Sequence, residues 1–328
     1  MIVKADPATL ANAVRGGNRR ALAQAITLIE STRTDDREIA VALLENLSAT
    51  ANHAIRIGVS GVPGVGKSTF IEAFGLHVIA AGRRVAVLSV DPSSSVSGGS
   101  ILGDKTRMDE LSRNPHAYVR PSPAGGTLGG VARRTREAIL LCEAAGFDVT
   151  IVETVGVGQS ETAVVEMTDM FVLLLMPAAG DELQGIKRGI MELADLVLVN
   201  KADGELINAA RRAANDYRLA LSLIPPRSKR WTPAVKLCSA LTGDGVPAAW
   251  EAVCCYQATM SASGELAARR ANQARAWMWN ETTASLIEAL RNHPQVRAAL
   301  PALETEVATG RLPPAIAAQR LLTVFLNR

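Results

Sequence analysis

The stretch GVPGVGKST, Gly61–Thr69, follows a short and largely apolar run, Ile55–Ser60. It fits the pattern G-x-x-x-x-G-K-[ST], with the apolar run before it and a helical pattern after it. Glycines let the backbone wrap so that its N–H groups point at phosphates, and the next helix adds its positive end. An ordinary glycine-rich turn is the alternative, but this context favours a nucleotide-binding loop. The residues expected to contact the nucleotide are Gly61, Val62, Pro63, Gly64, Val65, Gly66, Lys67, Ser68 and Thr69.

Short apolar runs recur along the chain and alternate with helical patterns. Each run is nearly continuous in apolar residues, which is typical of strands buried on both faces of a parallel sheet. The sequence therefore predicts an α/β fold, in which helices flank a mostly parallel central sheet. The predicted strands are Ile55–Ser60, Val85–Val90, Val149–Val152, Met170–Met176, Leu196–Asn200 and Val235–Cys238.

The segment LVLVNKAD, Leu196–Asp203, carries the NKxD pattern at a predicted strand end. An ionised Asp203 can only accept hydrogen bonds. Guanine offers two adjacent N–H donors on its Watson–Crick edge, whereas adenine would leave the carboxylate facing a lone pair, so the pattern favours GTP over ATP. Lys201 can lay its stem against the base, and Asn200 can tie this loop to the phosphate loop. The residues expected at the guanine are Asn200, Lys201, Asp203, Ser239, Ala240 and Leu241.

Acidic residues stand at two predicted strand ends. Asp91 follows Val85–Val90, and Glu153 follows another such run. Parallel sheets bind ligands at the carboxyl ends of their strands, so we expect both acids, with the Ser68 hydroxyl, to serve Mg²⁺. Asp104 is a third metal candidate on spacing alone. For Asp91 and Glu153, the alternative is a strand-end acid that caps the following turn.

The expected catalytic groups are Lys67, Asp91, Glu153 and the Gly156 amide. Lys67 supplies a positive charge for the β- and γ-phosphates, and the Gly156 amide is expected at the γ-phosphate. Val157 stands where the best-known GTP switches have a water-orienting glutamine. We therefore predict slow intrinsic hydrolysis that a partner accelerates.

Composition narrows the class of protein. The formal charge is +3 and no block of like charges stands out, so neither a nucleic acid nor a membrane surface is expected as a partner. The longest apolar run, Met170–Ala179, is far below the ~18 residues that a membrane span needs. The cysteines form no C-x-x-C pair and are expected to be buried, reduced thiols, which suits a cytoplasmic location. They are Cys142, Cys238, Cys254 and Cys255.

Helical patterns dominate both ends of the chain. We expect an N-terminal helical region at residues 1–50, a GTPase domain at 51–250 and a C-terminal helical arm at 251–328. Gly264–Asn292 predicts one long helix, on which Trp277 and Trp279 are expected to belong to a core.

The motifs SGVPGVGKST, VDPSS, GDKTRM, ETVGVGQSE and NKAD, in this order, resemble the GTPases associated with methylmalonyl-CoA mutase, a family also labelled MeaB or ArgK. The resemblance runs from about residue 10 to about residue 290. It implies a P-loop GTPase fold with a C-terminal dimerisation arm, hence a homodimer. It also implies a chaperone that gates delivery of adenosylcobalamin to the mutase from an adenosyltransferase, which is an indirect partner, and that protects or reactivates the mutase. The loop around Gln184 and Lys187 would be a switch that signals to the mutase, and this chain itself would bind no cobalamin.

Three other functions are compatible with parts of the sequence. A GTPase chaperone for nickel or another metal is the nearest, but such proteins usually carry histidine-rich tracts or a metal-binding cysteine pair. An ATP-using kinase would need an adenine pocket, against which the NKAD segment argues. A GTP-binding module that never hydrolyses its nucleotide would keep Ser68, Asp91 and Glu153 for Mg²⁺ alone.

Overall fold

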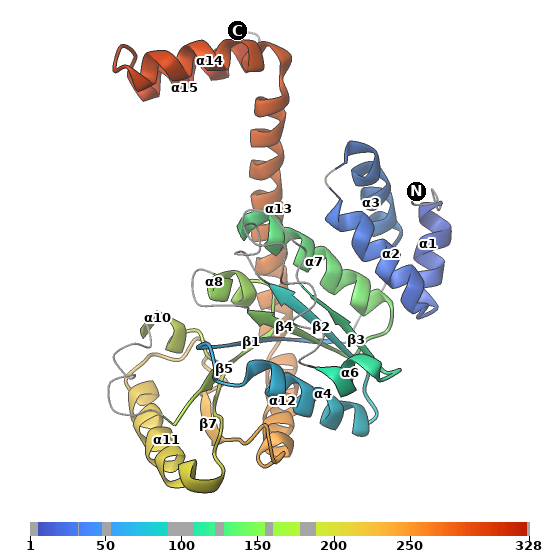
Figure 1. Ribbon diagram of the computed structural model, residues 1–328, viewed down its shortest axis with the longest axis vertical. Helices are drawn as coiled ribbons and strands as arrows, with labels where there is room; N and C mark the ends of the chain where they lie inside the picture. Colours follow the sequence, from blue (N-terminus) through green and yellow to red (C-terminus); the bar gives the residue numbers. More distant parts are fainter. Residues whose placement is uncertain are drawn as a thin grey trace. The chain divides into compact units, whose positions relative to one another are not determined.

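A computed structural model describes residues 6–31, 33–47, 54–90, 108–121, 128–154, 160–177 and 188–326. The described strands form a seven-stranded parallel sheet in the order β3-β2-β4-β1-β5-β6-β7 (Figure 1). This confirms the predicted α/β fold. The strands are β1 (Ile55–Gly61), β2 (Val85–Val90), β3 (Ala117–Arg120), β4 (Val149–Thr154), β5 (Met170–Leu175), β6 (Leu196–Val199) and β7 (Ala234–Leu237).

β1 lies at the centre of the sheet, where Ile57 is aligned with Ile151 of β4 and with Met170 of β5. Every residue of β1, β2, β4, β5 and β6 is buried, as their continuous apolar runs predicted. The edge strand β3 was not predicted, because it has only four residues and two of them are half-buried.

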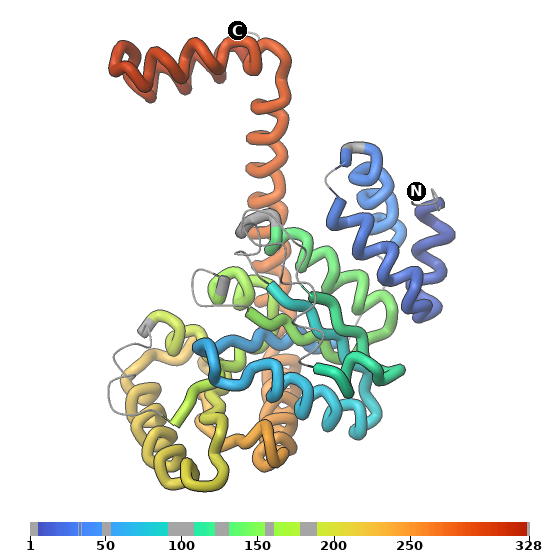
Figure 2. Tube along the Cα trace, in the orientation of Figure 1, coloured from blue at the N-terminus to red at the C-terminus, as the bar shows by residue number. Residues whose placement is uncertain are grey.

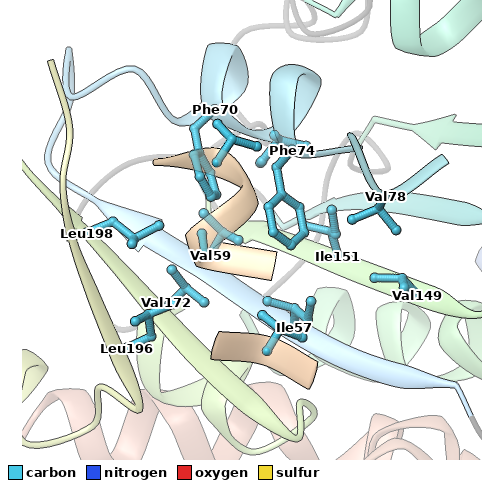
Figure 3. Close-up of a cluster of buried hydrophobic side chains, with 14 of the residues drawn as sticks. Ile57, Val59, Phe70, Phe74, Val78, Val149, Ile151, Val172, Leu196 and Leu198 are labelled. Carbon is cyan, nitrogen blue, oxygen red and sulfur yellow. The ribbon is translucent and has the colours of Figure 1, made fainter. Parts of the chain in front are cut away.

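Helices cover both faces of the sheet (Figure 1). α4 and α12 pack against each other on one face, and α7 and α8 contact the strands on the other. The core on the α4 side includes Phe70 and Phe74, which stack with ring centroids 5.4 Å apart above Ile57 and Val59 (Figure 3). The helical elements of this region are α4 (Lys67–Ala80), α6 (Asp109–Arg113), α7 (Leu128–Ala144), α8 (Ser160–Val165), α10 (Arg188–Met191), the 3-10 turn η2 (Gly204–Leu206), α11 (Ile207–Ser222) and α12 (Val246–Ala262).

Three N-terminal helices form a small bundle on α7, coloured dark to mid blue in Figure 2. They are α1 (Pro7–Arg15), α2 (Arg19–Glu30) and α3 (Thr34–Leu47). Local sequence sets their starts: the Asp6 carboxylate accepts from the Thr9 amide at 3.0 Å, and the Asn18 side chain accepts from the Arg20 amide at 3.0 Å. The Arg120 side chain of β3 forms an ion pair with Glu30, which fastens α2 to the edge of the sheet.

The amino ends of β1, β5 and β6 hold a buried charge network. Asp169, just before β5, accepts from Arg270 at 2.8 Å and 2.5 Å in a two-pronged arrangement, and from the Arg56 amide at 2.9 Å. Arg270 also donates to the Ala54 carbonyl at 2.6 Å. Asp195, just before β6, lies 3.4 Å from Arg269. Burial lowers the pKa of Arg270, but its hydrogen bond to Asp169 and the charge of Asp169 raise it more, so the net direction is upward. The start of α13 is thereby fixed to three strands.

The chain divides into two compact units, residues 1–270 and 271–328. The division falls within α13 (Glu265–Asn292). The second unit continues with α14 (Pro294–Ala308) and α15 (Pro314–Phe325), which pack together. The rings of His293 and Phe325 are in contact, with centroids 5.5 Å apart.

The expectation that both α13 tryptophans belong to a core is wrong for Trp279, which is 64% exposed, while Trp277 is half-buried. Burial was also expected for every cysteine, and this is wrong for Cys254 and Cys255, which are exposed on α12. Cys142 and Cys238 are buried, and burial raises the pKa of the Cys238 thiol to about 12.

None of the helices that the structure describes has the length and apolar character required to cross a membrane.

Candidate functional site

The phosphate loop joins β1 to α4 at the centre of the sheet. The side chain of Val65 is fully buried and holds the loop against the core. Gly66 has a φ of +92°, and a Cβ there would lie 2.8 Å from the Asn200 side-chain nitrogen, so glycine is required for both conformation and space. Lys67 begins α4, and its ammonium donates to the Gly61 carbonyl at 2.7 Å. The lysine thus lies across the loop that it is expected to complete.

Ser68 and Glu153 meet across the gap between α4 and β4. The Ser68 hydroxyl donates to the Glu153 carboxylate at 3.2 Å, and Glu153 is only 4% exposed. Next to Glu153, the Thr154 hydroxyl donates to the Ser60 hydroxyl at 2.9 Å, which ties β4 to the end of β1. Mg²⁺ prefers a small number of protein oxygen ligands beside phosphate and water, and this pair of oxygen donors fits that preference.

Asn200 connects the phosphate loop to the predicted guanine loop. Its side-chain amide donates to the Val65 carbonyl at 2.8 Å and accepts from the Ala240 amide at 3.0 Å. Asn200 is buried directly after β6. One side chain therefore fixes the distance between the loop expected at the phosphates and the loop expected at the base.

The other predicted guanine residues gather around Asp203. The Ser239 hydroxyl donates to the Asp203 carboxylate, and the Ala202 amide donates to the Cys238 carbonyl at 3.0 Å. Lys201 has a φ of +57°, an uncommon backbone conformation for a residue other than glycine. These contacts hold the NKAD segment and the Ser239–Leu241 segment side by side at the carboxyl ends of β6 and β7.

The sequence did not reveal how the loop after Ser239 is closed. The Ser239 amide donates to the Asp244 carbonyl at 2.8 Å, and the Thr242 hydroxyl donates to the Asp244 carboxylate at 2.7 Å. The Thr242 amide also donates to the Ser239 hydroxyl at 3.2 Å. The Ser239 hydroxyl therefore accepts one hydrogen bond from this loop and donates another to Asp203. The available signal was the polar run Thr242–Asp244, which reads equally well as an ordinary turn.

Several predicted site residues lie outside the described part of the chain. They are Asp91, Asp104, Gly156, Gln184 and Lys187. The described residues nevertheless bring together a phosphate loop, an acid beside its serine and the acid predicted to read the base, all at one edge of a parallel sheet. This combination defines the class of P-loop GTPases.

Comparison with known proteins defines the family. The family model described as methylmalonyl-CoA mutase-associated GTPase MeaB matches residues 22–295, and the chain belongs to this family of GTPases. It is 54% identical over 325 residues to a putative GTPase of Caulobacter vibrioides, with 99% of each chain covered. It is 52% identical over 322 residues to the mitochondrial methylmalonic aciduria type A homolog of Mus musculus, covering 95% of this chain and 78% of that protein. The crystal structure of a LAO/AO transport system kinase is similar over all of both chains, with 36% identity and a TM-score of 0.76.

Proposed function

We propose that this protein is a Mg²⁺-dependent, GTP-hydrolysing chaperone of an adenosylcobalamin-dependent methylmalonyl-CoA mutase. In this role it gates the delivery of cofactor from an adenosyltransferase, and it protects or reactivates the mutase. The observation that carries the proposal is the family match over residues 22–295, which spans the phosphate loop, the Glu153 motif and the NKAD segment. The cobalamin is bound by the partner proteins and not by this chain.

The described side chains have distinct tasks in this proposal. Lys67 stabilises charge on the β- and γ-phosphates, and Asp203 accepts hydrogen bonds from the guanine edge. Ser68 and Glu153 would hold Mg²⁺, aided by Asp91 and Asp104, and the ion supplies positive charge that offsets the charge of the phosphates. Asn200 keeps the phosphate and base loops in register through its hydrogen bonds to Val65 and Ala240.

The partner is proposed to raise a slow intrinsic rate. Val157 has no side-chain amide to orient water, and the Gly156 amide is proposed to bind the γ-phosphate. A group that completes the site is then supplied when the mutase binds, and the loop around Gln184 and Lys187 passes the signal between the two proteins.

We also propose that the protein is a homodimer. Within the second unit, α13 exposes large apolar side chains that a single chain leaves in contact with water: Met278, Trp279, Leu286 and Ile287. Trp279 and Leu286 are seven residues apart, so they lie on one side of the helix and could form an apolar seam with a second copy.

GTP and ATP hydrolysis by the purified chain, with and without an adenosylcobalamin-dependent mutase, tests the proposal. Slow GTP turnover that rises with the mutase, with no ATP turnover, is expected. Added Ni²⁺ in place of the mutase is the matched control for a metal-insertion chaperone, and stimulation by Ni²⁺ alone would favour that function. A GTP turnover rate that does not change when the mutase is added would overturn the chaperone role while leaving the GTPase assignment intact.

A further inference from the structure

The small net charge of the chain hides a strongly basic segment. Residues 207–237, from the start of α11 to the end of β7, contain seven basic residues and one acidic residue, a formal charge of +6. The whole chain carries only +3, so all other residues together carry −3. The expectation that no like-charge region stands out holds for contiguous runs, but it misses this segment, whose charges are spaced along a helix and a loop.

The same segment exposes apolar side chains. Leu219 and Leu223 lie one turn apart near the end of α11, and they are 67% and 76% exposed. Pro225 and Pro226 follow after Ile224 and are also exposed. Large apolar side chains gathered on a surface, rather than scattered singly, often mark an interaction site.

The loop that follows α11 is held in a fixed shape. Arg227 donates to the Leu193 carbonyl at 2.8 Å, and the Ser228 hydroxyl donates to the Glu265 carboxylate at 2.6 Å. The Trp231 indole donates to the Asp195 carbonyl at 2.8 Å. Because the loop is already ordered, a partner that binds here loses little free energy in ordering it.

Two cations on this loop remain available to a partner. Lys229 and Arg230 are exposed, and neither forms an ion pair with any residue that the structure describes. Arg227, by contrast, points inward to within 3.8 Å of Asp195. We define the α11-end surface by its exposed residues Leu219, Leu223, Pro225, Pro226, Lys229 and Arg230.

The α11-end surface is separate from the nucleotide site. Its loop leads into the amino end of β7, whereas the phosphate loop and the NKAD segment follow the carboxyl ends of β1 and β6. In Figure 1, α11 runs alongside β7 between these two edges of the sheet. A partner can therefore occupy the α11-end surface without touching GTP.

We propose that the α11-end surface docks an acidic, partly apolar face of the client mutase, an inference that rests on the proposed function. Charge complementarity sets the sign of the partner, and the two leucines supply the apolar contact that a protein interface requires. A protein surface fits better than the alternatives. Single-stranded nucleic acids are usually bound through exposed aromatic platforms along a groove, and membranes through a longer apolar helix face.

Two double variants test the charged and apolar parts separately. Lys229→Glu with Arg230→Glu reverses the charge, and Leu219→Ser with Leu223→Ser removes the apolar contact. Each is expected to weaken binding to the mutase by on the order of tenfold or more, as loss of a central interface contact does. Only the charge variant should flatten the salt dependence of binding. Intrinsic GTP turnover should stay at the wild-type value in both.

Arg113→Glu is the matched charge control, since Arg113 is exposed on α6. Val41→Ser is the matched apolar control, since Val41 is 47% exposed on α3. Wild-type mutase binding by both double variants would overturn the docking surface but not the proposed function. No mutase binding by the wild-type chain would overturn both. Binding to anionic vesicles or to an oligonucleotide that the charge variant loses, with mutase binding unchanged, would assign the surface to another partner.

Discussion

Buried acids at the two ends of the sheet have chemically different partners. At the carboxyl ends of the strands, Glu153 is buried beside the neutral hydroxyl of Ser68, at 3.2 Å. At the amino ends, Asp169 is fully buried and accepts two hydrogen bonds from the guanidinium of Arg270. The first acid has a partner that can also bind a metal ion, whereas the second is neutralised by a permanent cation.

We interpret this difference as one between a proposed metal-binding role for Glu153 and a structural role for Asp169. A buried carboxylate gains little net stability from its ion pair, but removal of either member leaves an uncompensated charge in the interior. Burial alone therefore does not identify a functional acid, and the chemistry of the groups that contact it must be considered as well. The comparison predicts that substitutions at the amino ends change stability, and that substitutions at the carboxyl ends change nucleotide binding and turnover.

The largest effect is expected at the amino ends. Asp169→Ala leaves Arg270 without its charge partner and should lower the free energy of unfolding by about 3–5 kcal/mol. Urea denaturation measures this, and Asp169→Asn serves if the alanine variant does not fold. Asp109→Ala is the control, because Asp109 is exposed and lies 4.0 Å from Arg113, a pair that contributes less than about 1 kcal/mol. Equal, small losses in both variants would contradict a structural role for Asp169.

Lys67→Ala tests the carboxyl ends. Loss of a preorganised positive charge at the phosphates should lower kcat for GTP hydrolysis by roughly 10²–10³-fold, while the melting temperature changes little. Single-turnover GTP hydrolysis is the measurement, with Arg113→Ala as a control that removes an exposed cation. A variant that unfolds at a much lower temperature than the wild type would show that Lys67 stabilises the fold, as Asp169 and Arg270 are expected to do.

A smaller effect on nucleotide affinity is expected when the base loses one hydrogen-bond donor. Inosine triphosphate lacks the exocyclic amino group of guanine, so it should bind on the order of 10–100-fold more weakly than GTP, the value of one charge-assisted hydrogen bond. Asp203→Ala should bring the two affinities close together. If the variant still prefers GTP by the wild-type factor, a group other than Asp203 reads this edge of the base.

The smallest effect is expected for Arg270→Lys. The substitution keeps the positive charge beside Asp169 but loses the two-pronged contact, so we expect a loss of about 1–2 kcal/mol in unfolding free energy. The GTP affinity should equal that of the wild type. A change in GTP affinity without a change in stability would break the separation between the two ends of the sheet.

Local sequence predicted most of the fold and much of the candidate site. Continuous apolar runs located the buried strands, because parallel strands covered on both faces have no polar side to interrupt them. The edge strand β3 was missed since only half of it is buried. Motif spacing located Lys67 and Asp203 after two strands of the sheet, and their roles at the nucleotide stay predictions.

Contacts between distant segments could not be predicted in this way. The hydrogen bond from Ser239 to Asp203 joins residues 36 positions apart, and the two-pronged contact of Arg270 with Asp169 joins residues 101 positions apart. No local sequence pattern indicates either pair. Trp279 illustrates a different gap. Helical periodicity places it on one face, but only the three-dimensional structure shows that its own chain leaves it exposed.

The Asn200 bridge has a consequence for synthesis of the chain. It joins Val65 to a residue 135 positions later, and its second bond requires Ala240, a further 40 positions on. A nascent chain emerges from the ribosome N-terminal end first. The phosphate loop is therefore made early but cannot be fixed to the base loop until residue 240 has emerged. GTP would then stabilise only chains whose sheet is nearly complete, so its binding would favour the folded state only late in synthesis.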